Sequence, residues 1–173
     1  MSRYFPHTPY AEDQPLAGTI LTIHVLVRSV TTGTVLGIGK YGTQSLVRRI
    51  RKQPAPLVPK SHLLLAATGK YTIWTVGIVS LGLVARMWGR EDIEWKDRTW
   101  RLLENKGQIE CDDFTYAGML AGLGAAAVKS VRKTGWVGAV GAVGLGSTAG
   151  MLGYMGWRYG VHGGKFAESE ERS

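Results

Sequence analysis

The chain has 173 residues, a formal net charge of +8 and 24 glycines against only three phenylalanines. Its apolar content therefore consists mostly of small residues, whereas a water-soluble core needs the volume of leucine, isoleucine, valine and phenylalanine. The one cysteine, Cys111, excludes an intrachain disulfide framework and a multi-cysteine metal site. Residues 1–15 include Glu12 and Asp13, so they predict a polar tail and neither a secretory signal nor an Arg-rich transit peptide.

Residues 16–39 form the first apolar segment, which is long enough for a membrane-spanning helix. His24 and Arg28 interrupt it four residues apart and so lie on one face of that helix. Ionisable groups at membrane depth usually face protein or water. Two interpretations stay open, namely an intramembrane polar contact or long side chains that reach the membrane surface.

The connection from the first to the second apolar segment is purely basic. It holds six Lys or Arg and no acid between residues 40 and 60. Such clusters can bind nucleic acid, but this one lies between two apolar segments. We therefore predict that it orients the chain in the membrane and attracts anionic lipid headgroups. The residues assigned to this role are Arg48, Arg49, Arg51 and Lys52.

The second apolar segment, residues 62–85, contains Lys70, whose long side chain is expected to reach the membrane surface. The following residues 86–113 are different, with six Lys or Arg against eight Asp or Glu. Tryptophan, leucine and isoleucine alternate with charge there, which predicts a short amphipathic helix on the membrane surface or docked on a partner. Asp112 and Asp113, at the end of this stretch, suit the N-terminus of the next helix.

The third and fourth apolar segments, residues 114–131 and 135–157, are rich in glycine and alanine. The fourth has no charged residue and eight glycines. In lipid, small residues let helix backbones approach closely, and this contact becomes a main source of packing energy. Small residues recur at four-residue intervals in both segments, which predicts a tight antiparallel pair. The ridges are Gly118, Gly122, Ala126 and Ser130 in the third segment and Gly138, Ala142, Gly146 and Gly150 in the fourth, and Gly33 and Gly37 repeat the spacing in the first.

Glycine motifs that resemble dinucleotide fingerprints begin at Gly37 and Gly144, but neither has the downstream acid or the sheet context that the motif needs. No catalytic constellation stands out, and the four histidines lack metal-ligand spacing. The sequence therefore predicts no enzyme activity and no cofactor.

These features together predict an all-α integral membrane protein with a four-helix bundle over residues 16–160 and a polar tail over residues 161–173. With four spans, both purely basic loops face the same side. This plan, with the stretch "DDFTYAGMLAGLGAAAVKSVRKTG", resembles the mitochondrial inner-membrane translocase family, which also includes a four-helix accessory subunit of respiratory complex I. Residues 94–113, "EWKDRTWRLLENKGQIECDD", are in addition similar to uncharacterised small fungal membrane proteins.

The resemblance implies a non-catalytic structural or assembly subunit of a mitochondrial inner-membrane complex, with respiratory complex I as the leading candidate. The alternative is a translocase-like channel or carrier component of the same membrane, in which Arg28 or His24 contacts the passenger. The expected partners are other membrane subunits and anionic lipid headgroups, with no nucleic acid.

Overall fold

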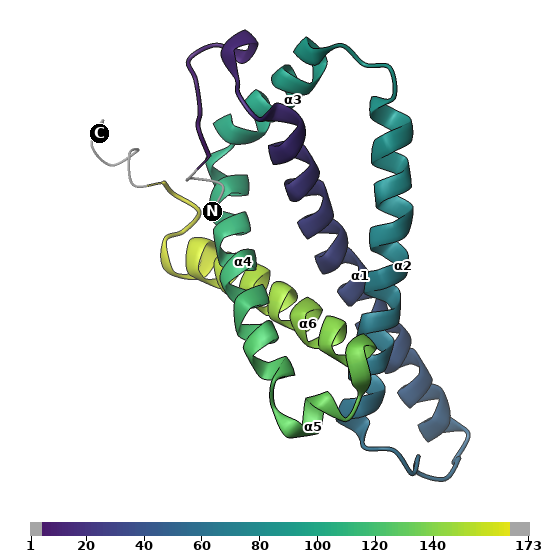
Figure 1. The fold of residues 1–173 in the computed structure, drawn as a ribbon. Coiled ribbons are helices and arrows are strands. Elements are labelled where there is room, and N and C mark those ends of the chain that lie inside the picture. The colour runs from purple at the N-terminus through teal and green to yellow at the C-terminus, as the bar shows by residue number, and fades with distance from the viewer. Residues whose placement is uncertain (1–4, 167–173) are drawn as a thin grey trace.

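A computed structural model describes residues 5–166, and within that range every regular element is helical (Figure 1). The all-α prediction is confirmed. In chain order the elements are the 3-10 turn η2 (Ala11–Asp13), α1 (Ala17–Ile50), α2 (Lys60–Met87), α3 (Asp92–Glu104), α4 (Lys106–Ala126), α5 (Lys129–Arg132), α6 (Gly135–Met155) and the π-helical turn η3 (Gly156–Val161).

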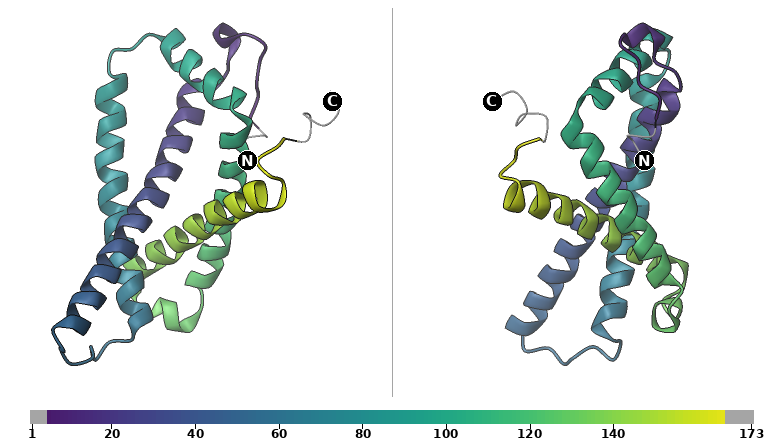
Figure 2. Two further views of the ribbon diagram at one scale, coloured as in Figure 1. Left: turned by 180° about the vertical axis from the view of Figure 1, so that it is seen from behind. Right: turned by 90° about the vertical axis from the view of Figure 1, so that its left-hand side faces the viewer.

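The long helices α1 and α2 form an antiparallel hairpin, and α6 runs obliquely across it (Figures 1 and 2). The same α6 also packs along α4, so that it contacts α1, α2 and α4. α6 is therefore the element that holds the hairpin and α4 together.

Three helices in the described part of the chain are long and apolar enough to cross a membrane, namely α1, α2 and the continuous helix over residues 135–161. α4 does not reach that standard, because its uncharged part, residues 114–126, spans about 20 Å against about 30 Å of hydrocarbon. The four-span arrangement thus stays a prediction, whereas three candidate spans are present.

Two helix boundaries differ from the sequence-based segments. The predicted third segment, residues 114–131, is interrupted at Ala127 and Val128, so Ser130 belongs to the short α5 and does not lengthen the span. The helix also starts earlier, at Lys106, which puts Asp112 and Asp113 inside it and not at its N-terminus. Apart from these two limits of α4, α1 extends beyond the first apolar segment to Ile50 and so includes Arg48 and Arg49 of the basic connection.

The interior and the exterior of the molecule have inverted polarity relative to a water-soluble protein. Buried positions are mostly glycine or hydroxyl residues, whereas large apolar side chains such as Trp74, 72% exposed, and Leu81, 71% exposed, point outward. The hydroxyls bond within the bundle: Thr31 Oγ1 lies 2.5 Å from Ser147 Oγ, and others donate to their own helix backbone. An apolar exterior over a small, polar core is the distribution expected in lipid.

α3 is the predicted amphipathic helix, and it docks on its own chain. Thr99 Oγ1 donates to the Ala17 carbonyl at 2.8 Å, and Trp100 Nε1 donates to the Thr8 carbonyl at 2.9 Å. Leu103 is buried on the same side. These contacts with α1 and the N-terminal segment cover part of the apolar face of α3, whereas Ile93, 45% exposed, stays accessible to lipid or to a partner protein.

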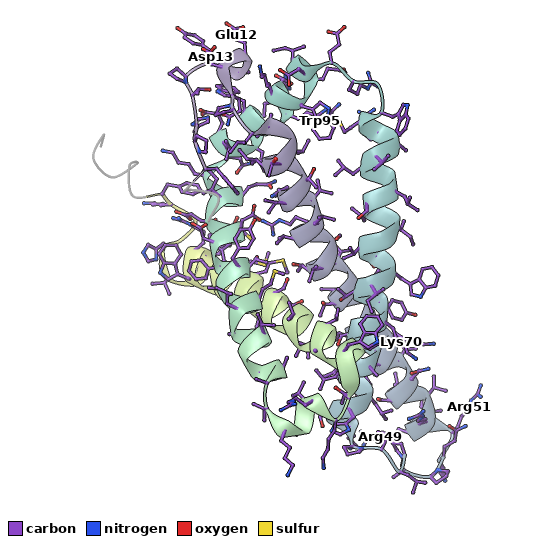
Figure 3. The ribbon with its side chains drawn as sticks, viewed as in Figure 1. Glu12, Asp13, Arg49, Arg51, Lys70 and Trp95 are labelled. Carbon is purple, nitrogen blue, oxygen red and sulfur yellow. The ribbon has the colours of Figure 1, made fainter. Side chains whose placement is uncertain are left out.

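Charge is separated along the long axis of the molecule (Figure 3). Glu12 and Asp13 lie at the end that carries α3, and Arg49 and Arg51 lie at the opposite end, in the α1–α2 turn. No Asp or Glu occurs between residues 14 and 90 or between residues 114 and 167, so the turn and the α5 region are purely basic. Both basic connections lie at the same end of the fold (Figure 1).

We expect reversal of Arg48, Arg49, Arg51 and Lys52 to glutamate to scramble the orientation of the chain, because Lys and Arg in short loops set topology. The measurement is protease protection of a tag fused to the C-terminus in intact vesicles. Protection identical to that of the unaltered chain would show that these four charges do not set the orientation.

Candidate functional site: a glycine seam and an interhelical ion-pair cluster

α4 and α6 meet along a seam of small residues at backbone distance. A Cβ placed on Gly118 would overlap the Gly146 carbonyl oxygen, and a Cβ on Gly146 would overlap the Gly118 carbonyl oxygen. Gly122 lies in the same way against Ala142. The residue numbers run in opposite directions along the two helices, so the pair is antiparallel. Four of the five predicted packing glycines, Gly118, Gly122, Gly146 and Gly150, lie on this seam.

The fifth predicted packing residue, Gly138, is placed differently. Its nearest neighbour is the side chain of Thr134, one turn earlier in the chain, and not α4. A second glycine face of α6 replaces it: Gly141 lies against the Leu65 carbonyl of α2, and Gly144 lies against the Thr34 hydroxyl of α1. This face is absent from the sequence-based prediction, which considered only the four-residue repeat that begins at Gly138.

The α1–α2 hairpin uses the same kind of contact. Gly33 lies against the backbone of Thr72 and Gly37 against that of Thr68. Gly69 of α2 in turn approaches the carbonyl of Val137 in α6. Each of the three long apolar helices therefore touches another through a glycine whose Cβ position is already occupied by a neighbouring backbone.

A charged cluster joins α1 to the first half of α4. His24 Nδ1 lies 2.6 Å from Asp112 Oδ2, and Arg28 Nη2 lies 2.6 Å from Asp112 Oδ1. Arg28 Nη1 also donates to Cys111 Sγ at 3.2 Å. The Asp112 side chain is 1% exposed. The side chains of His24 and Arg28 thus share one partner within the chain, the carboxylate of Asp112.

This arrangement compensates the charge of a nearly buried carboxylate, where isolated charge is costly. The four-residue spacing of His24 and Arg28 lets both side chains reach Asp112 from one face of α1. Asp112 was the residue that sequence reasoning missed as a partner. The sequence pattern could have indicated this partner, because Asp112 lies just before an apolar segment and is an acid that could pair with basic groups inside another apolar segment.

A second buried ion pair ties α4 to the end of α6. Arg158, 3% exposed, forms an ion pair with Glu110 and donates to the carbonyl of Lys165. Its guanidinium lies 4.9 Å from the ring centroid of Trp157 and 4.2 Å from that of Phe166, which adds cation–π attraction. Glu110 and Asp112 therefore make the first half of α4 a hub that contacts both α1 and the C-terminal turn.

An open cavity of about 460 Å³ lies beside the cluster, with His24, Arg28, Cys111, Tyr154 and Tyr159 in its lining. The cationic groups that reach it are already engaged with Asp112. Among residues 5–166 no group of three or more His, Cys, Asp or Glu is arranged to hold a metal ion. The chemistry present at this site is ion pairing and hydrogen bonding between helices.

The other predicted residues lie away from this cluster. Arg48, Arg49, Arg51 and Lys52 belong to the basic end, and Lys70 is exposed on α2 (Figure 3). Comparison with known protein families, with curated proteins and with solved structures finds no match.

Proposed function

We propose that the chain is a non-catalytic structural or assembly subunit of a mitochondrial inner-membrane complex, with respiratory complex I as the first assembly to test. The observation that supports this proposal is a pair of glycines on α2, Gly77 and Gly82, that have no other atom within 4 Å of a Cβ position. They flank an outward face that carries Trp74, Ile78 and Leu81.

Glycine lowers helix stability by about 1 kcal/mol relative to alanine. A glycine in a membrane helix offsets this cost where it lets the backbone of another helix pack closely against it. Glycines where helices cross, such as Gly33, Gly69 and Gly118, have such a neighbour within the fold. Gly39 and Gly42 toward the basic end of α1 and Gly124 in the last turn of α4 have none, but they lie near the end of an apolar segment or beyond it. Gly77 and Gly82 have no such neighbour either, and a helix of a companion subunit would supply it. The ion-pair clusters then serve to hold the helices rigid behind that docking face.

The two-residue variant Gly77→Leu, Gly82→Leu tests the proposal. We expect the variant to fold, because neither position has a close neighbour, and to be lost from the large assembly because the added side chains block a partner helix. The measurement is migration of the chain in native gels of detergent-extracted mitochondrial membranes. The matched control is Gly124→Leu, which is also free of neighbours within 4 Å but lies in the last turn of α4 and not in the middle of an apolar span, so this variant should stay in the assembly.

Migration of the unaltered chain as a free protein, with no large companion, would contradict the proposal. Crosslinks between the chain and an arrested precursor would instead support a translocase-like component. In that case His24 and Arg28 would have to exchange Asp112 for the passenger, since both contact that carboxylate in the structure.

A further inference from the structure

The turn between α1 and α2 forms an open cavity of about 620 Å³ whose lining combines cations with apolar side chains. The cations are Arg48, Arg49 and Lys60, and the apolar wall includes Tyr41, Leu46 and Leu63. We propose that this cavity binds one anionic phospholipid, with its phosphate against the cations and the start of an acyl chain along the apolar wall. The proposal needs a membrane-embedded chain but no partner complex.

The turn that forms the cavity has a defined geometry. After α1 ends, Lys52 adopts the left-handed conformation, with a φ of 49°. Gln53 N donates to the Arg48 carbonyl at 3.0 Å, and Lys52 N donates to the Arg49 carbonyl at 3.2 Å, which is the hydrogen-bond pair of a Schellman motif. Three prolines in residues 53–59 then restrict the backbone. The start of the loop is therefore folded back toward the last turn of α1, where it forms a wall of the cavity.

The three cations have no counter-charge of their own. No Asp or Glu occurs between residues 14 and 90, and in the part of the chain that the structure describes no carboxylate pairs with Arg48, Arg49 or Lys60. Uncompensated cations that converge on one cavity favour an anionic ligand.

The position of the cavity along the two helices and its apolar lining favour a lipid over a free anion as the ligand. Because Gly37 lies against Thr68 in an antiparallel pair, the last turns of α1 lie beside the first turn of α2. The apolar run of α2 begins there, at His62 and Leu63. The cavity thus straddles the boundary between the apolar span and the basic loop, which is where headgroup phosphates lie. A soluble phosphate would gain nothing from Leu46 or Leu63.

The basic loop offers two pairs of cations that carry equal charge, one pair in the cavity lining and one pair outside it. Arg49 and Lys60 line the cavity, whereas Arg51 and Lys52 belong to the same turn and do not. Attraction between a diffuse positive surface and anionic lipid depends on both groups alike. Binding of one lipid in the cavity depends far more on Arg49 and Lys60. Substitution of Arg51 and Lys52 is therefore a matched control.

The experiment is native mass spectrometry of the full chain in detergent, titrated with dioleoyl phosphatidic acid. We expect the unaltered chain and the Arg51→Gln, Lys52→Gln variant to retain one lipid per chain with similar affinity. The Arg49→Gln, Lys60→Gln variant should bind roughly thirty-fold more weakly, since each cation near an anionic headgroup contributes about a five-fold factor. Dioleoyl phosphatidylcholine should bind the unaltered chain much more weakly than phosphatidic acid.

A second variant guards against loss of folding. Ser45→Trp keeps every charge and fills the cavity from an exposed lining position, so it should also weaken retention of phosphatidic acid. Equal weakening by the two glutamine variants, or unchanged retention in Ser45→Trp, would overturn the proposal in favour of diffuse attraction. If inorganic phosphate displaces the lipid at equal concentration, the ligand of the cavity is a free anion and the proposal of a lipid is wrong.

Discussion

Replacing Gly146 with leucine is expected to separate α4 from α6 and to remove most of the folded protein from the membrane. The new side chain would overlap the backbone of Gly118, and backbone atoms cannot move aside as a flexible side chain can. Overpacking in protein cores costs about 1–3 kcal/mol, and we expect at least about 3 kcal/mol here. The measurements are the steady-state amount of the chain in membranes and its thermal unfolding in detergent.

The control for this variant is Gly124→Leu. Gly124 lies on α4 and, unlike Gly118 and Gly122, has no other atom within 4 Å of its Cβ position. The same chemical change there removes a glycine that disfavours the helix, so the free energy of unfolding should stay unchanged or rise by up to about 1 kcal/mol. If Gly146→Leu is as abundant and as stable as Gly124→Leu, the glycine seam does not hold α4.

The second large effect is expected for Asp112→Asn. This change leaves Arg28 without its carboxylate partner and removes the ionic contact of His24. Removal of one partner from a buried ion pair costs about 3–5 kcal/mol. We expect a correspondingly lower midpoint of chemical unfolding in detergent, and a lower amount of protein in the membrane.

Two further variants separate the loss of the ion pair from a general effect of substitution. The double variant Arg28→Gln, Asp112→Asn removes both charges and should recover much of the lost stability, because no charge stays uncompensated. Asp97→Asn removes one partner of an exposed pair with Arg101 and should cost no more than about 1 kcal/mol. A loss for Asp112→Asn no larger than that for Asp97→Asn would contradict the structural role of the cluster.

The apolar segments were predictable because length and composition alone determine whether a helix suits lipid. α2 and α6 lie close to the second and fourth predicted segments, and α1 contains the first and continues to Ile50. The third predicted segment, residues 114–131, corresponds to α4, which begins earlier, at Lys106, and ends earlier, at Ala126. Its limits were missed because charge was taken to end a helix, whereas Glu110 and Asp112 lie within α4 and find partners on other helices.

The contacts between helices were predictable only in part. The repeat of Gly118, Gly122, Gly146 and Gly150 indicated one helix pair, since four-residue spacing puts these positions on one face. The second face of α6, with Gly141 and Gly144, depends on where the α1–α2 hairpin lies, and no local pattern contains that information. The pairing of Arg28 with Asp112 is equally non-local.

The central claim is that glycines and hydroxyls pack the interior so that the apolar side chains face lipid. The most direct measurement is the hydrodynamic state of the purified chain after detergent is withdrawn, by size-exclusion chromatography with light scattering. The account predicts aggregation in plain buffer and recovery of a single species when the chain is returned to detergent or nanodiscs. A monodisperse, folded monomer in plain buffer would contradict it.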